Sequence, residues 1–195
     1  MANYFWLPYY DESWNLFLNL RAGVNENAKI LPYSNGGHGY SGFAIGDWSD
    51  VNDDDRLQIA THGRKYTTDT VAWVCPGGFV TWTPAQMADV LQGFLGDKRI
   101  HYELLACFGA NSWGLASSFA EKLAADMRGA NMRGTLTALK GATNIGAGQG
   151  RQTGTSRITT GMKMPWKVHG KVIKPGGTDP RGPLSSDSTV KWNLT

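Results

Sequence analysis

Short apolar runs separated by polar turns make up most of the first two thirds of the chain. Four of them predict buried strands, at residues 57–60, 71–74, 100–106 and 135–139. Runs of this length, bounded by glycine or polar residues, are typical of strands rather than helices. The first run ends at His62-Gly63 and the third ends at Cys107.

Two stretches have helical periodicity instead. Thr83 as N-cap, Pro84 at the first helical position and Gln86 in a capping box predict a helix that ends at Gly96. A second helix is predicted from about residue 112, because apolar residues recur four apart at Leu115, Phe119, Leu123 and Met127.

The alternation of strands and helices predicts an α/β fold. Right-handed crossovers between successive strands give a largely parallel sheet flanked by helices on both faces. Sites in such sheets lie beyond the carboxyl ends of the strands. We therefore expect His62 and Cys107, which end two different strands, to face one cleft.

The remaining segments complete a single domain over residues 1–175. Its core is expected at about 40–140, with a strand at 42–48, and an aromatic segment at 14–20 predicts a buried strand or short helix. Residues 141–160 are predicted to be loop, and 162–173 alternate apolar and basic residues as in a hairpin. This gives a C-terminal β-hairpin or flap at about 155–175 and an extended tail at 176–195.

Composition favours a soluble, folded protein. Hydrophobic residues make up 41% of the 195 residues, and no run is long enough to span a bilayer. We expect no Sec signal peptide and no membrane partner, and a location in the cytoplasm or in the cytosol of a target cell reached by a specialised secretion route. The two cysteines provide neither a disulfide framework nor metal-ligand spacing, so no metal is expected.

Charge is distributed unevenly along the chain. Residues 1–127 carry a balance of −6, whereas residues 128–195 carry +9. A basic final third is typical of a surface that binds an anion, but also of a solvated face or tail.

Cys107 is the candidate nucleophile. At a strand-to-helix junction, unpaired N–H groups and the positive end of a helix stabilise the thiolate. A cysteine after an apolar run is also a common small core residue, so Cys107 alone does not decide the matter. Cys75 is the weaker candidate, because Pro76 offers no N–H and no helix begins there.

Taken with their strands and spacing, the two motifs resemble the caspase-like cysteine peptidases, the clan that includes clostripain, gingipain and separase. One apolar block is followed by His62-Gly63, and about 45 residues later a second apolar block is followed by Cys107. Within that clan the chain is most similar to the autoprocessing cysteine protease domains of large secreted bacterial toxins, over residues 56–175. The similar features are the His62-Gly63-Arg64 context, the helix start at Thr83-Pro84 and the segment 118–123 after the cysteine.

The resemblance implies a cysteine endopeptidase that acts through an acyl-enzyme, either as a toxin domain that processes itself or as a free effector that cuts another protein. Cys107 would be the nucleophile, His62 the proton shuttle, and the N–H groups of Gly63 and Cys107 the oxyanion donors. No third catalytic residue is evident, although Asp53, Asp54 or Asp55 is available to orient the histidine. Phe108 stands where the family often has serine, so substrate preference does not transfer.

The resemblance also implies an activator. The toxin domains bind inositol hexakisphosphate between the core and the flap, and no other cofactor is required. The candidate ligands in this chain are Arg64, Lys140, Arg151, Arg157, Lys163, Lys167 and Lys171. A protein or peptide substrate and this polyphosphate are thus the expected partners.

Two alternatives remain at this stage. A papain-like peptidase would use Cys107 with His169, but leaves the His62-Gly63 strand end without a role. A non-catalytic α/β module would use its basic final third to bind a polyanion such as nucleic acid, a partner not expected of the peptidase.

Overall fold

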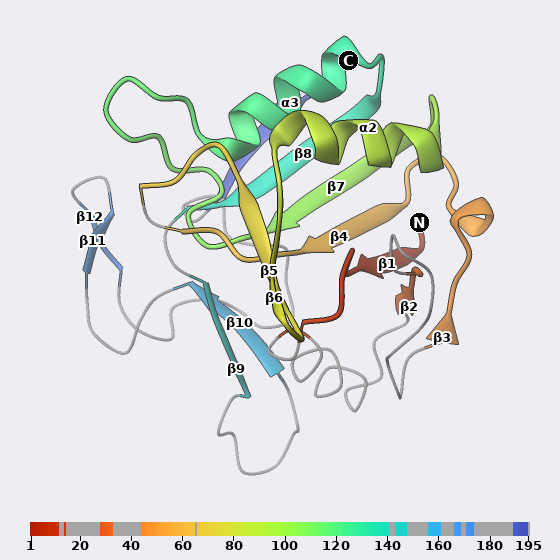
Figure 1. Ribbon diagram of the computed structural model, residues 1–195. Helices are drawn as coiled ribbons and strands as arrows, with labels where there is room; N and C mark the ends of the chain where they lie inside the picture. Colours follow the sequence, from red (N-terminus) through yellow and green to blue (C-terminus); the bar gives the residue numbers. More distant parts are fainter. Residues whose placement is uncertain are drawn as a thin grey trace.

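A seven-stranded sheet runs through the protein, with its strands in the order β13-β8-β7-β4-β1-β2-β3 (Figure 1). The computed structural model describes residues 1–11, 14, 28–32, 44–64, 66–140, 143–147, 156–160, 166–168, 171–173 and 189–194. All the strand pairs in the main sheet are parallel except β13 with β8. The predicted α/β class and largely parallel sheet are confirmed.

The strands of the main sheet are β1 (Asn3–Trp6), β2 (Ala28–Ile30), β3 (Ala44–Ile45), β4 (Arg56–Ala60), β7 (Arg99–Leu105), β8 (Arg133–Leu139) and β13 (Thr189–Asn193). Three further antiparallel hairpins pair β5 (Val71–Cys75) with β6 (Gly78–Trp82), β9 (Thr143–Ala147) with β10 (Ser156–Thr160), and β11 (Trp166–Val168) with β12 (Lys171–Ile173). The helical elements described over their whole length are the 3-10 helix η1 (Trp48–Asp50), α2 (Pro84–Leu95) and α3 (Phe119–Gly129).

Strand β7 shows why these apolar runs form the centre of the sheet. Ile100, Tyr102 and Leu104 are fully buried, whereas the alternating His101 and Glu103 are only half-buried on the opposite face. This period of two is the pattern of a strand with one fully apolar face. The predicted strands at 57–60, 100–106 and 135–139 correspond to β4, β7 and β8.

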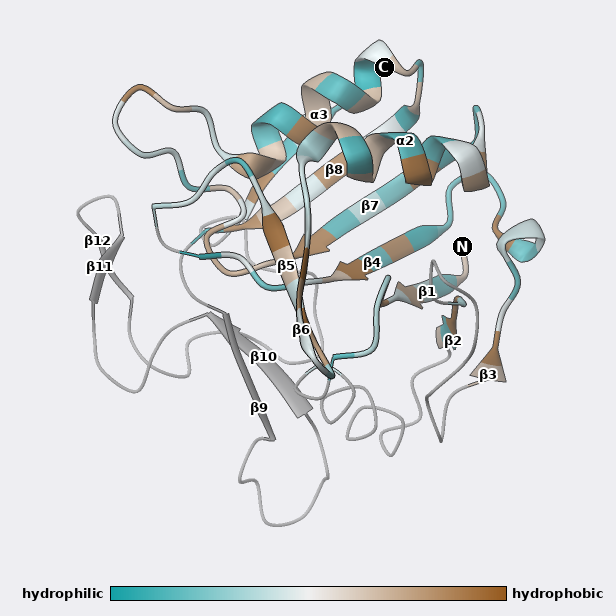
Figure 2. Cartoon of the chain, in the orientation of Figure 1, coloured by the Kyte–Doolittle hydropathy of each residue, from teal (hydrophilic) through white to brown (hydrophobic). Residues whose placement is uncertain are grey.

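Helices α2 and α3 pack side by side on one face of the sheet (Figure 1). Apolar and polar positions alternate along both helices (Figure 2), and the buried ones include Leu91 of α2 and Leu123 of α3. The capping box of Thr83 and Gln86 begins α2 as predicted. Neither helix has the length and apolarity needed to cross a bilayer. Because both lie on the same face, the predicted helical layer on the second face stays a prediction.

The predicted start of the second helix is wrong. Helix α3 begins at Phe119, where the side chain of Ser118 caps the N–H of Glu121, and Leu115 is fully exposed in the preceding loop. Leu115 fits the helical spacing by chance. The capping hydrogen bond at Ser118 fixes the start of the helix.

The core extends further toward the N-terminus than the predicted 40–140. Strand β1 lies between β4 and β2, and Phe5 and Trp6 are buried there. The aromatic content of the first residues therefore marks a central strand. Of the predicted element at 14–20, only Trp14 lies within the described residues, and it is buried and helical.

Three other local predictions need correction. The strand at 71–74 does not join the main sheet, because a turn at Pro76-Gly77 with a φ of 92° at Gly77 folds β6 back onto β5. The interval 141–160 contains the paired strands β9 and β10 rather than loop alone. The strand expected at 42–48 shortens, within the described residues, to β3 followed by η1.

The last residues are also not simply a tail. Strand β13 pairs antiparallel with β8, the N–H of Leu194 donates to the carbonyl of Gly134, and Arg128 donates to the carbonyl of Asn193. The predicted hairpin at 162–173 is present as β11 and β12. The domain thus continues beyond residue 175, because the sheet takes its edge strand from there.

Gly134 provides a test of the β7–β8 packing. A Cβ at this position would overlap the backbone of Ile100, and the φ of 113° disfavours other residues. Gly134→Ala should lower the free energy of unfolding by at least about 2 kcal/mol, measured by urea denaturation. The matched control is Gly93→Ala on α2, where a Cβ meets open space. It should stabilise the protein by about 0.5–1 kcal/mol. Equal effects of the two substitutions would contradict the packing described.

Candidate active site

The strands that carry His62 and Cys107 are neighbours in the sheet. Strands β4 and β7 pair in parallel, with Ala60 opposite Leu105. The pairing continues past the end of β4, where the N–H of Thr61 donates to the carbonyl of Leu105 at 3.3 Å. His62 and Cys107 each lie two residues after this pair, so both lie at the same edge of the sheet.

Gly63 lies directly against the backbone of Cys107. A Cβ at Gly63 would overlap the carbonyl oxygen of Cys107 and would lie only 3.4 Å from its backbone nitrogen. Only glycine permits this approach. The two segments that sequence analysis expected to meet are thus in contact through their backbones.

The backbone and the ring of His62 are both held in place. Its N–H and carbonyl each form a 2.9 Å hydrogen bond with Ala72, so hairpin β5–β6 fixes the end of β4. Its Nε2 lies 2.9 Å from Oδ2 of Asp11. The side chain is 31% exposed, which leaves the imidazole accessible from solvent.

Asp11 is a fully buried carboxylate that holds the imidazole. Oδ2 also accepts the N–H of Val74 at 2.7 Å, and Oδ1 accepts the N–H of Trp14 at 3.1 Å. Burial by itself raises the pKa of Asp11, but the hydrogen bonds from His62, Val74 and Trp14 outweigh it and hold the pKa below its usual value. Asp11 is therefore a fixed anion that orients the ring of His62.

Asp11 was not predicted from the sequence, and the three carboxylates expected in its place lie elsewhere. Asp53, Asp54 and Asp55 precede β4, whereas His62 follows it, so the length of the strand separates them from the ring. Their oxygens are also occupied elsewhere. Asp53 and Asp54 accept from Arg99, and Asp55 is buried and accepts the N–H groups of Ala2 and Asn52.

The loop after Cys107 is tightly bonded and conformationally strained. The N–H of Gly109 donates to the carbonyl of Ala106, and Phe108 between them has a φ of 58°. This left-handed conformation is costly for a residue with a large side chain. A strained turn at this position holds the cysteine at the tip of the strand.

The start of the helix differs from the expected one, and two of its N–H groups already have partners. Helix α3 begins only at Phe119, and its first N–H groups are already used, since Ala120 donates to the carbonyl of Gly109 and Glu121 to the side chain of Ser118. Gly63 offers a donor instead. Its N–H makes no hydrogen bond to any described residue, and the glycine lies beside Cys107.

The other thiol has a different environment. Cys75 ends β5, and burial together with the negative charge of Asp11 raises its pKa, although a backbone hydrogen bond at Val80 opposes the change. Cys75 therefore stays protonated near neutral pH and is a poor nucleophile. Neither Cys75 nor Cys107 forms a disulfide bond.

The remaining histidine within the described residues lies elsewhere. Nδ1 of His101 lies 3.1 Å from Oγ1 of Thr135, near the start of β7 and at the opposite end of the sheet from Cys107. His38 and His169 fall outside the described residues.

Of the seven expected anion ligands, the structure describes the side chains of Arg64 and Lys140 only. Arg64 is exposed beside Gly63, and Lys140 is half-buried just after β8. Arg157, Lys167 and Lys171 lie on β10, β11 and β12, for which only the strand positions are described. Arg151 and Lys163 lie outside the described residues. Among the residues that are described, no cluster of His, Cys, Asp and Glu side chains is suited to a metal ion.

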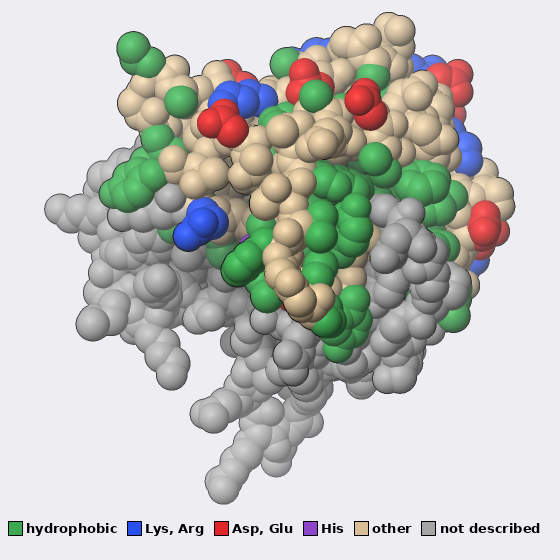
Figure 3. All heavy atoms as spheres, in the orientation of Figure 1, with side chains coloured by type: hydrophobic (Ala, Val, Ile, Leu, Met, Phe, Trp, Pro, Cys, Tyr) green, Lys and Arg blue, Asp and Glu red, His purple; other side chains and the backbone are tan. Residues whose placement is uncertain are grey.

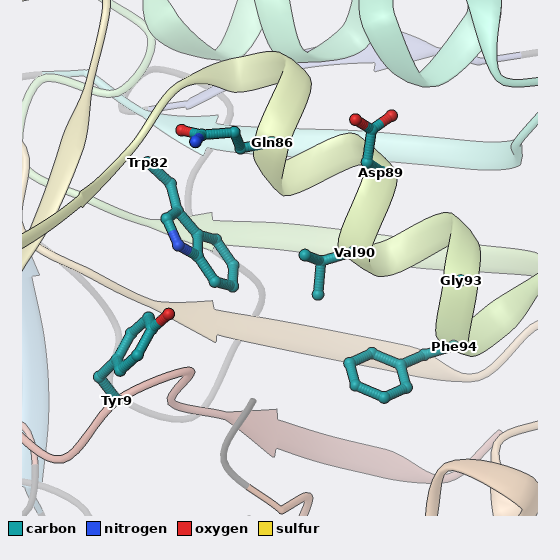
Figure 4. A pocket seen from close by; sticks show the side chains of 7 residues that line it. All are labelled: Tyr9, Trp82, Gln86, Asp89, Val90, Gly93 and Phe94. Carbon is teal, nitrogen blue, oxygen red and sulfur yellow. The ribbon is translucent and has the colours of Figure 1, made fainter. Parts of the chain in front are cut away.

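A shallow groove of about 680 Å³ runs along α2, apart from the histidine and the cysteine (Figure 4). It is lined by Tyr9, Trp82, Gln86, Asp89, Val90, Gly93 and Phe94. Figure 3 shows hydrophobic side chains gathered on this face of the molecule. Phe94 stacks on Trp48 with ring centroids 4.2 Å apart, so the groove is an outward extension of the aromatic core. None of the expected site residues lines it.

Comparison with known proteins adds no family to this description. Neither a scan against protein-family models nor a search of curated proteins found a match to the chain. The site must therefore be interpreted from its own geometry.

The hydrogen bonds of Asp11 predict a pH-dependent contribution to stability. Because its native pKa is lowered, the ionised carboxylate stabilises the fold fully above its unfolded pKa of about 4, and this stabilisation is lost as the pH falls through the native value. The difference in unfolding free energy between the wild-type protein and Asp11→Asn should thus be largest near pH 7 and shrink below about pH 4. Urea denaturation from about pH 3 to pH 7 measures it.

The control for that experiment is Asp89→Asn, which removes an exposed carboxylate on α2. It should change the unfolding free energy by less than about 0.5 kcal/mol. A difference for Asp11→Asn that stays constant across this pH range would show that its charge does not contribute to stability.

Proposed function

We propose that the protein is a cysteine endopeptidase in which Cys107 is the nucleophile, His62 the general base and acid, and Asp11 the residue that orients the imidazole. The observation that carries the proposal is that an oriented histidine and Cys107 lie at the ends of two neighbouring strands. A buried carboxylate holds His62 at the end of β4, and Gly63 lies against the backbone of Cys107 at the end of β7. A base fixed by a third group beside a nucleophile is the arrangement that nucleophilic catalysis requires.

The chemistry follows from these positions. His62 accepts the thiol proton of Cys107, and the thiolate attacks the carbonyl carbon of the scissile peptide bond. The tetrahedral intermediate collapses to a thioester when the C–N bond breaks, and the imidazolium gives its proton to the departing amine. Water, deprotonated by the same imidazole, then attacks the thioester and releases the acid and the free thiol.

Backbone donors complete the proposed site. The N–H of Gly63 makes no hydrogen bond within the described part of the chain, and it belongs to the residue that packs on Cys107. We assign this group and the N–H of Cys107 as the donors for the oxyanion. Fixed backbone donors at a developing negative charge contribute strongly to catalysis of acyl transfer.

The resemblance to caspase-like peptidases supports the same proposal. His-Gly follows β4 and the cysteine follows the adjacent parallel strand β7, with hairpin β5–β6 and helix α2 between them. On this proposal the protein is a toxin or effector protease that cleaves itself or a protein in a target cell. The position of His169 outside the described residues leaves the papain-like alternative to experiment.

Cleavage of a peptide library by the purified chain tests the assignment. Cys107→Ala should abolish cleavage and His62→Ala should lower kcat/KM by about 10²- to 10⁴-fold, because proton transfer is lost. Asp11→Asn should lower it by a factor within the same range, about 10²-fold or more, while Cys75→Ser should retain activity. Full activity of His62→Ala, with loss of activity in His169→Ala, would replace this assignment with the papain-like one.

Activation by a polyphosphate is a second part of the proposal, supported by the +9 balance of residues 128–195. Inositol hexakisphosphate should raise kcat/KM at least about tenfold at low salt, and the effect should weaken as salt screens the charges. Lys167→Ala combined with Lys171→Ala should reduce the activation and leave the basal rate unchanged. The same reduction by Lys29→Ala, on β2 and paired with Asp50, would indicate a general charge effect instead of a site.

A further inference from the structure

Two loops follow the proposed catalytic residues, and the two loops contact each other. The first connects His62 to β5 and the second connects Cys107 to α3. At its beginning the first loop is fixed by the pairing of His62 with Ala72. In its middle part the N–H of Thr67 donates to the carbonyl of Arg64.

Lys122 on α3 reaches across to this middle part. Its Nζ donates to Oγ1 of Thr68 at 3.1 Å and to Oδ1 of Asp69 at 2.6 Å. Thr68 is buried and the side chain of Lys122 is 33% exposed, whereas that of Asp69 is 82% exposed. The contact therefore combines a sheltered hydrogen bond with an ion pair that salt can screen.

The helix that carries Lys122 is itself bonded to the second loop. The N–H of Ala120 donates to the carbonyl of Gly109, two residues after Cys107. A second contact joins the loops directly, since the ring of Tyr66 packs edge-on against Trp113 with centroids 4.5 Å apart. Lys122 thus connects the loop after the histidine to the element that holds the loop after the cysteine.

We propose that Lys122 is a positioning residue, which keeps the loop after His62 docked on α3 and so maintains the alignment of the imidazole and the thiol. This inference rests on the proposed function. It assigns Lys122 no contact with substrate. Small displacements of reacting groups lower the rate of the chemical step more than they weaken binding, so the effect should appear in kcat.

The kinetic test compares Lys122→Met, Lys122→Arg and Asp69→Asn with the wild-type protein. Lys122→Met should lower kcat about tenfold with KM changed by less than about twofold, and Lys122→Arg should restore most of the loss. Asp69→Asn should cause a smaller loss of kcat. Raising the salt from about 0.05 M to about 0.5 M should lower the wild-type kcat about twofold and leave Lys122→Met unaffected.

A matched control is the ion pair of Lys29 and Asp50, in which Nζ lies 3.0 Å from Oδ2 at the other side of the sheet. Lys29→Met removes a comparable surface ion pair and should leave kcat and its salt dependence unchanged. An equal loss of kcat in Lys29→Met and Lys122→Met, or a loss in Lys122→Met that Lys122→Arg does not restore, overturns the inference.

Alkylation of Cys107 separates this inference from the proposed function. In a Cys75→Ser background, iodoacetamide reports only on Cys107, and no peptide substrate is needed. We expect the neutral-pH rate constant to fall about tenfold in His62→Ala and about threefold or more in Lys122→Met. A rate that falls in His62→Ala but not in Lys122→Met contradicts the role of Lys122 and keeps the peptidase proposal. A rate that is the same in all three proteins contradicts both.

Discussion

The close approach of the Gly63 backbone to the Cys107 backbone is the constraint on which the proposed site depends. It exists because β4 and β7 are adjacent and parallel and because the register of their pairing extends beyond the end of β4. A side chain at residue 63 would force the two strand ends apart. The geometry is thus set by the backbone, and the sheet, rather than a flexible loop, delivers the histidine and the cysteine to one edge.

Within this backbone framework, the buried carboxylate of Asp11 orients the imidazole of His62. Asp11 is fully excluded from solvent, yet His62 and the N–H groups of Val74 and Trp14 supply enough hydrogen bonds to keep it ionised. One anion therefore joins the segment after β1, the end of β4 and hairpin β5–β6. Because these three elements meet at the same carboxylate, a displacement of any one of them is expected to change the position of the imidazole.

The parts of the fold that depend on local sequence could be predicted. The capping box at Thr83 and the apolar runs ending at His62 and Cys107 are signals that lie within a few residues of the elements they define. Asp11 could not be found in this way, because His62 and Val74 are 51 and 63 residues away from it and meet it through the position of β1 between β4 and β2. Strands β10 and β13 were missed for the same reason, since their polar sequences become strands only through pairing.

The position of β13 has a consequence for the order in which the sheet is completed. This strand covers the outer edge of β8, but the interval 140–188 separates the two in the chain. During synthesis, both proposed catalytic residues and the strands that carry them leave the ribosome well before residues 189–193. The edge of β8 therefore stays unpaired in the nascent chain until β13 is available. During that time β8 is exposed to pairing with strands of other chains.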